Sequence, residues 1–91
     1  MEIKILGEKY TVKEVELIDY DAGTFGQIDH IKNVIEIKKD IPAEKKKVTL
    51  LHEILHAIFQ QLGFDEEHDD EHLIKSLSAS LIQVFTENKL F

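Results

Sequence analysis

The stretch that decides the fold is VTLLHEILHAIFQQLG, which occupies residues 48–63. Apolar side chains recur in it every three or four positions, at Leu51, Leu55, Ile58 and Leu62. This spacing predicts an amphipathic helix whose wide apolar stripe packs against a core. Pro42 suits the first helical position, and Gly63 supplies the left-handed conformation in which helices commonly end.

The residues before this helix alternate between apolar and charged side chains, a pattern typical of half-buried β-strands. Strands are predicted at residues 2–6, 10–18, 27–30 and 34–38, which form two hairpins. Turn formers fill residues 19–26, and these residues are predicted to form the loop between the hairpins.

A second helix is predicted after Gly63. Residues 64–72 hold six acidic side chains in nine positions and begin this helix, whose apolar positions continue to Phe85. The chain therefore consists of two hairpins followed by two helices, which is an α+β domain with an antiparallel sheet of about four strands. Its 91 residues have the length of one domain, residues 1–91.

The charge and the cysteine content exclude several classes of function. Cysteine is missing, which excludes disulfides, Cys-ligated zinc and thiol catalysis. The formal net charge is −7 and all 11 basic residues are Lys, so the Arg-containing basic surface of a nucleic-acid binder is not expected. The first residues do not resemble a signal peptide, and no apolar run approaches the roughly 20 residues of a membrane helix. We therefore expect a cytoplasmic protein that binds neither nucleic acid nor membrane.

The first predicted helix carries His52-Glu53-Ile54-Leu55-His56, a complete HExxH motif. Residues four apart lie on one helix face, about 5–6 Å from each other, so His52 and His56 can bind one metal ion. Glu53 is then placed to take a proton from a water molecule on that ion, whose pKa zinc lowers toward about 7. His52 and His56 are therefore the candidate zinc ligands, and Glu53 is the candidate catalytic residue.

A catalytic zinc site needs a third protein ligand, and the chain offers carboxylates, His68 and His72 for it. Because the chain turns at Gly63, the start of the second helix is expected to return toward the histidine pair. Glu71 and His72 are the best placed there. We favour Glu71, which completes a two-histidine, one-glutamate set, while His72 would give a three-histidine set. The acidic residues 65–67 are expected only to complement the helix dipole.

The run VIEI at residues 34–37, followed by VTLLHEILH at residues 48–56, resembles the core of ImmA/IrrE-type zinc metallopeptidases. The similarity covers about residues 26–88, and small members of that family are common in phages and mobile elements. The resemblance implies a gluzincin-like site with the two motif histidines and an acidic residue of the following helix as ligands, and Glu53 as general base. Larger relatives cleave repressor proteins, which implies a transcriptional repressor as one substrate.

These features together predict a minimal zincin-like domain that hydrolyses peptide bonds with one Zn²⁺ ion per chain. The substrate is expected to be a protein or flexible peptide, bound in extended form along an edge strand, for which we take residues 34–38. One alternative is a catalytically inactive zinc-binding module that acts through protein interactions. A second is a metal-free helical interaction domain, since an accidental HExxH arises in roughly 3% of shuffled sequences of this composition.

Overall fold

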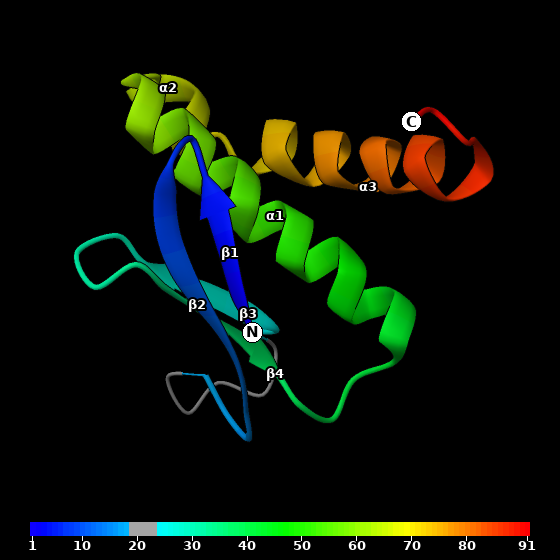
Figure 1. Cartoon of the computed structure of the whole chain (residues 1–91), viewed down its shortest axis with the longest axis horizontal. Helices are drawn as coiled ribbons and strands as arrows, with labels where there is room; N and C mark the ends of the chain where they lie inside the picture. Colours follow the sequence, from blue (N-terminus) through cyan, green and yellow to red (C-terminus); the bar gives the residue numbers. More distant parts are fainter. Residues whose placement is uncertain (19–23) are drawn as a thin grey trace.

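The computed structural model describes residues 1–18 and 24–91. Its elements are β1 (Glu2–Ile5), β2 (Glu8–Val15), β3 (Gly26–Asp29), β4 (Val34–Lys38), α1 (Ala43–Leu62), α2 (Asp65–His68) and α3 (Glu71–Glu87). The four strands form one sheet and the helices follow them along the chain, so the predicted α+β class is confirmed (Figure 1). Part of the predicted loop, residues 19–23, lies outside the described residues.

The sheet is mixed, with the strand order β1-β2-β4-β3. Both predicted hairpins are confirmed as antiparallel pairs, β1 with β2 and β3 with β4. The hairpins meet through β2 and β4, which run parallel with Thr11 opposite Val34 and Val15 opposite Lys38. The expectation of an entirely antiparallel sheet is therefore wrong at this pair. Alternation of side chains decides which face of a strand is buried, but it does not decide which neighbour the strand takes or in which direction.

The strand β4 lies inside the sheet, and β3 forms one of its edges. The prediction that residues 34–38 are an edge strand is therefore wrong. The physical reason is burial, because Ile35 and Ile37 of β4 are 0% and 3% exposed, whereas β3 has no fully buried residue. The more apolar strand takes the place with a neighbour on each side, where more apolar surface is removed from water.

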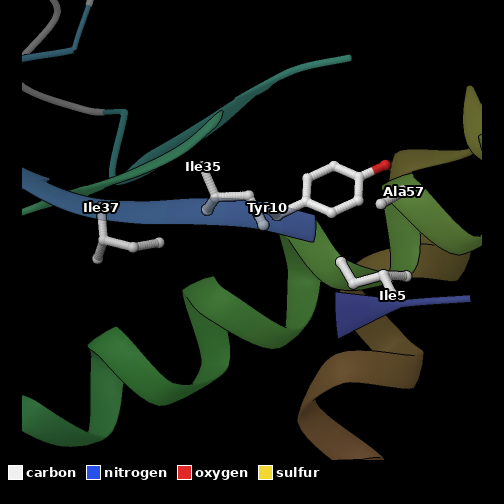
Figure 2. Close-up of a cluster of buried hydrophobic side chains, with 5 residues drawn as sticks. All are labelled: Ile5, Tyr10, Ile35, Ile37 and Ala57. Atoms are coloured by element: carbon white, nitrogen blue, oxygen red, sulfur yellow. The ribbon is translucent and has the colours of Figure 1, made fainter. Parts of the chain in front are cut away.

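The core lies between α1 and one face of the sheet. Its buried members are Ile5, Tyr10, Ile35, Ile37 and Ala57 (Figure 2). Gln61 joins α1 to the first hairpin through two hydrogen bonds. Its Nε2 donates to the carbonyl oxygen of Ile5 at 3.1 Å and to Tyr10 Oη at 3.0 Å. The helix that carries the HExxH motif is thus held to the sheet by packing and by partly buried hydrogen bonds.

The helices differ from the prediction in two places. Pro42 directly precedes the first residue of α1, one position earlier than expected, and Gly63 ends α1 with φ +77° as predicted. The second predicted helix is instead two helices, α2 and α3. Asp70 marks the break, since its side chain accepts a hydrogen bond from the Leu73 backbone N–H at 3.0 Å and caps α3. In the part of the chain that the structure describes, no helix is long and apolar enough to cross a membrane.

Candidate metal centre

The middle of α1 carries His52, Glu53 and His56, which line a cleft between this helix and β3. Glu53 and His56 are 5% and 8% exposed, and the His52 side chain is 19% exposed. These polar groups are buried because the motif lies within the apolar stripe that packs α1 onto the sheet. Polar side chains buried to this extent require partners.

Glu71, the first residue of α3, reaches both histidines. The chain turns back through α2, so that the start of α3 lies beside α1 (Figure 1). Glu71 Oε1 lies 2.8 Å from His56 Nε2, and Glu71 Oε2 lies 3.1 Å from His52 Nε2. The two Nε2 atoms are 3.2 Å apart. Glu71, the side chain that we favoured as third ligand from the sequence, therefore lies beside both histidines.

These three side chains could hold one metal ion. Two imidazole nitrogens and a carboxylate oxygen are donors that zinc takes at about 2.0–2.2 Å, usually in a tetrahedral arrangement. Donors arranged in this way lie about 3.3 Å from one another. The two Nε2 atoms are 3.2 Å apart, and one donor atom from each of the three residues lies within 4.8 Å of the other two. The Glu71 side chain is 56% exposed, so solvent or a substrate can approach the centre from that side.

His72 stands outside this group of donors, as far as the described residues go. It follows Glu71 on α3 and is exposed. Consecutive helix residues point about 100° apart, so Glu71 and His72 cannot both face α1. The arrangement with Glu71 is thus the one that the fold brings together.

The Glu53 carboxyl group is suited to proton transfer near neutral pH. Burial raises the pKa of Glu53 to about 7, and the negative charge of Glu71 acts in the same direction. A group with such a pKa can both accept and release a proton at neutral pH. Burial lowers the pKa of His56, although Glu71 opposes this, and so favours the neutral imidazole that ligates metals.

The cleft beside the centre has a volume of about 840 Å³. On one side of the cleft, the backbone of β3 lies very close to α1. A Cβ atom added at Gly26 would lie 2.5 Å from Thr49 Cγ2 and 3.5 Å from Glu53 Cγ. Lys45 and Phe25 also line the cleft, with the Lys45 ammonium 5.4 Å from the centre of the Phe25 ring. An edge strand therefore runs directly beside the Glu53 side chain.

Two further histidines line the same cleft. His68 of α2 places its Nδ1 3.1 Å from Nδ1 of His56 and also 3.1 Å from the His56 carbonyl oxygen. His30, in the turn after β3, packs edge-on against the His68 ring with the ring centroids 5.0 Å apart. Neither contact could be expected from the sequence. A turn and a four-residue helix are too short for a periodic pattern that would predict where their side chains point.

Comparisons of the chain with protein-family models, with curated proteins and with solved structures find no match. The resemblance to ImmA/IrrE-type metallopeptidases therefore rests on the sequence runs that suggested it.

Proposed function

We propose that this chain is a zinc-dependent peptidase in which His52, His56 and Glu71 hold one Zn²⁺ ion and Glu53 is the general base. The observation that carries the proposal is the presence of a buried HExxH glutamate and a His, His, Glu donor set in one cleft. A buried glutamate alone, or a His, His, Glu group alone, has a purely structural explanation. Together they have the composition of a hydrolytic metal site, with a nucleophile-activating group beside an open donor set.

Glu53 is the group that moves protons in this proposal. A zinc ion held by the donor set would supply a Lewis acid that lowers the pKa of a water molecule and polarises the scissile carbonyl group. Glu53 takes the proton that the attacking water gives up and delivers it to the leaving amine. In the metal-free chain its pKa is about 7, and the positive charge of a bound zinc ion would lower this pKa and favour the carboxylate that accepts the proton.

The proposed substrate is a protein segment or flexible peptide that lies in extended form along β3. An edge strand can pair with an added strand through its outer backbone groups, and β3 is the edge that lines the cleft. Because Gly26 brings this edge against Glu53, a peptide paired with β3 would pass the general base. A transcriptional repressor, implied by the resemblance, is one substrate of this kind.

The first test is the metal content of the protein purified without chelator. We expect one zinc ion per chain, lost in His56→Ala. Cleavage of an unstructured protein such as casein is then compared between the wild type, Glu53→Gln and Glu66→Gln. Glu53→Gln should keep zinc and lose at least about 100-fold in rate, which is the usual contribution of a general base. Glu66 is exposed on α2, so Glu66→Gln is the matched control and should cleave normally.

Each result separates the readings of the site. Full activity of Glu53→Gln would overturn the mechanism. Zinc binding by a wild-type chain that cleaves nothing would favour the catalytically inactive zinc-binding interaction module. A chain without zinc, even after zinc is added back, would overturn both zinc hypotheses.

A further inference from the structure

The His56 ring has partners on both of its nitrogen atoms. Its Nε2 faces Glu71 Oε1 at 2.8 Å and His52 Nε2 at 3.2 Å, while its Nδ1 faces His68 Nδ1 at 3.1 Å. The residue is only 8% exposed, so these contacts, more than solvent, decide which nitrogen carries the proton. The position of that proton determines whether Nε2 can ligate a metal.

A neutral imidazole carries one proton, on either Nδ1 or Nε2. A nitrogen that ligates a metal uses its lone pair, so His56 must carry its proton on Nδ1 when Nε2 is a ligand. The resulting Nδ1–H needs an acceptor, because an unpaired donor in a buried position is destabilising. Within the described residues, the atom in hydrogen-bonding range of His56 Nδ1 is Nδ1 of His68.

We infer that His68 is a positioning residue for the metal centre: its Nδ1 accepts a hydrogen bond from His56 Nδ1–H and so satisfies the buried donor of the His56 tautomer that ligates zinc. This inference rests on the proposed zinc site. It also assigns the tautomer of His68, whose own proton must then be on Nε2. The contact of His68 Nδ1 with the His56 carbonyl oxygen at 3.1 Å is then no longer a hydrogen bond, which is the cost of this arrangement.

The same contacts favour the opposite tautomers in the zinc-free chain. There, His56 Nε2–H donates to Glu71 Oε1, and His56 Nδ1 is an acceptor. His68 Nδ1–H can donate to His56 Nδ1 or to the His56 carbonyl oxygen, both at 3.1 Å. Each ring carries one proton with and without zinc. Zinc binding therefore exchanges the tautomers of both rings and leaves the number of protons on them unchanged.

His68 acts through His56 and does not itself ligate the ion. The two nitrogens of an imidazole point in diverging directions, and His68 contacts the nitrogen that is turned away from Glu71. The donor group found among the described residues leaves His68 out. Edge-to-face contacts with His56 and His30, at centroid distances of 4.8 and 5.0 Å, fix the His68 ring so that its acceptor stays in place.

Zinc affinity, measured by competition with a chromophoric chelator, tests the role of the acceptor. His68→Phe keeps a ring but removes the acceptor, and we expect it to weaken zinc binding by about 10–100-fold. His68→Asn places an amide oxygen close to the former Nδ1, and we expect affinity within a few-fold of the wild type. His72 is an exposed histidine next to Glu71, so His72→Phe is the matched control and should bind zinc as the wild type does.

The tautomers are measured on the wild-type chain, so this result does not depend on whether the variants fold correctly. Two-bond ¹H–¹⁵N correlation spectra of the imidazoles distinguish the protonated nitrogen from the unprotonated one. On addition of Zn²⁺ we expect the His56 proton to be on Nδ1 and the His68 proton to move from Nδ1 to Nε2. The ring nitrogens of His30 and His72 serve as internal references, because neither residue belongs to the proposed donor set.

The outcomes separate this inference from the proposed function. Equal zinc affinity of the wild type and His68→Phe, or a zinc-bound chain in which His68 keeps its proton on Nδ1, would overturn the inference and leave the zinc site intact. A wild-type chain that binds no zinc would overturn the zinc site and the inference together.

Discussion

The backbone of Gly26 lies so close to Thr49 that a Cβ atom at position 26 would be 2.5 Å from Thr49 Cγ2. This contact holds the edge strand β3 against the helix that carries the candidate centre. We therefore expect Gly26→Ala to lower the free energy of unfolding by about 1–3 kcal/mol, because the added methyl group displaces the strand or the helix. Urea unfolding of the metal-free protein measures the change.

The methyl group of Thr49 provides the control. Thr49→Ser removes Cγ2 but keeps the hydroxyl group, which donates to the Lys45 carbonyl oxygen at 2.7 Å. In the Thr49→Ser background, Gly26→Ala should lower the free energy of unfolding much less than it does in the wild type. The difference between the two costs is the coupling energy of the double-mutant cycle. An equal cost of Gly26→Ala in both backgrounds would show that the close approach to Thr49 is not what the glycine serves.

Metal removal should reveal which residue of α3 is the third ligand. With free zinc at 100 times its dissociation constant, we expect the free energy of unfolding of the wild type to rise by about 2.7 kcal/mol, and a chelator should abolish the rise. Glu71→Gln should lose most of this gain, because the carboxylate 2.8 Å from His56 Nε2 is gone. Thermal unfolding with and without zinc measures both effects.

His72→Gln is the matched substitution, since His72 is the neighbouring residue and is exposed. It should keep the full zinc-dependent gain. If the results were exchanged, with His72→Gln insensitive to zinc and Glu71→Gln stabilised by it, the ligand set would be the three-histidine one.

Local periodicity explains why the candidate centre could be predicted in part. His52 and His56 are four apart on a helix that the apolar spacing already indicates, so their convergence follows from helix geometry. The meeting with Glu71 could be expected because Gly63 turns the chain back toward α1. The sequence favoured Glu71 but left His72 open, because the side chain that faces α1 depends on the residue at which α3 begins, and Asp70 sets that position.

Contacts between distant segments explain what could not be predicted. The alternation in residues 34–38 identifies a strand. Whether this strand or β3 pairs on both sides, and so lies inside the sheet, depends on contacts with β2, which is distant in the sequence. Likewise, the contact of His68 with His56 joins a four-residue helix to α1 across a turn. Neither relationship leaves a repeating pattern in the sequence, so only the three-dimensional arrangement reveals it.

Gln61 should be important for stability although it is not part of the candidate centre. Gln61→Leu leaves the hydroxyl group of Tyr10, a residue only 1% exposed, without the amide at 3.0 Å from it. We expect a loss of about 1–3 kcal/mol in the free energy of unfolding, the cost of an unsatisfied buried polar group. Gln60→Leu, at the exposed neighbouring position, should change it little.

A second variant identifies the cause of that loss. Tyr10→Phe removes the hydroxyl group itself, so adding it to Gln61→Leu should restore part of the stability, since removing both partners costs less than removing one. Urea unfolding of the four proteins measures the cycle. If Tyr10→Phe gave no recovery, the role of Gln61 would lie in its bond to the Ile5 carbonyl oxygen instead.

The cap of α3 should link helix stability to metal binding. Asp70 accepts from the Leu73 backbone N–H at 3.0 Å, and Glu71 is the first helical residue after it. Asp70→Ala should cost about 1 kcal/mol of folding free energy and should also weaken zinc binding, because a frayed first turn no longer holds Glu71 at the two histidines. Asp70→Ser can still cap the helix and should restore both properties, while Asp69→Ala, at an exposed position between α2 and α3, should affect zinc binding less. Loss of stability in Asp70→Ala with zinc affinity unchanged would mean that Glu71 reaches the histidines without help from the cap.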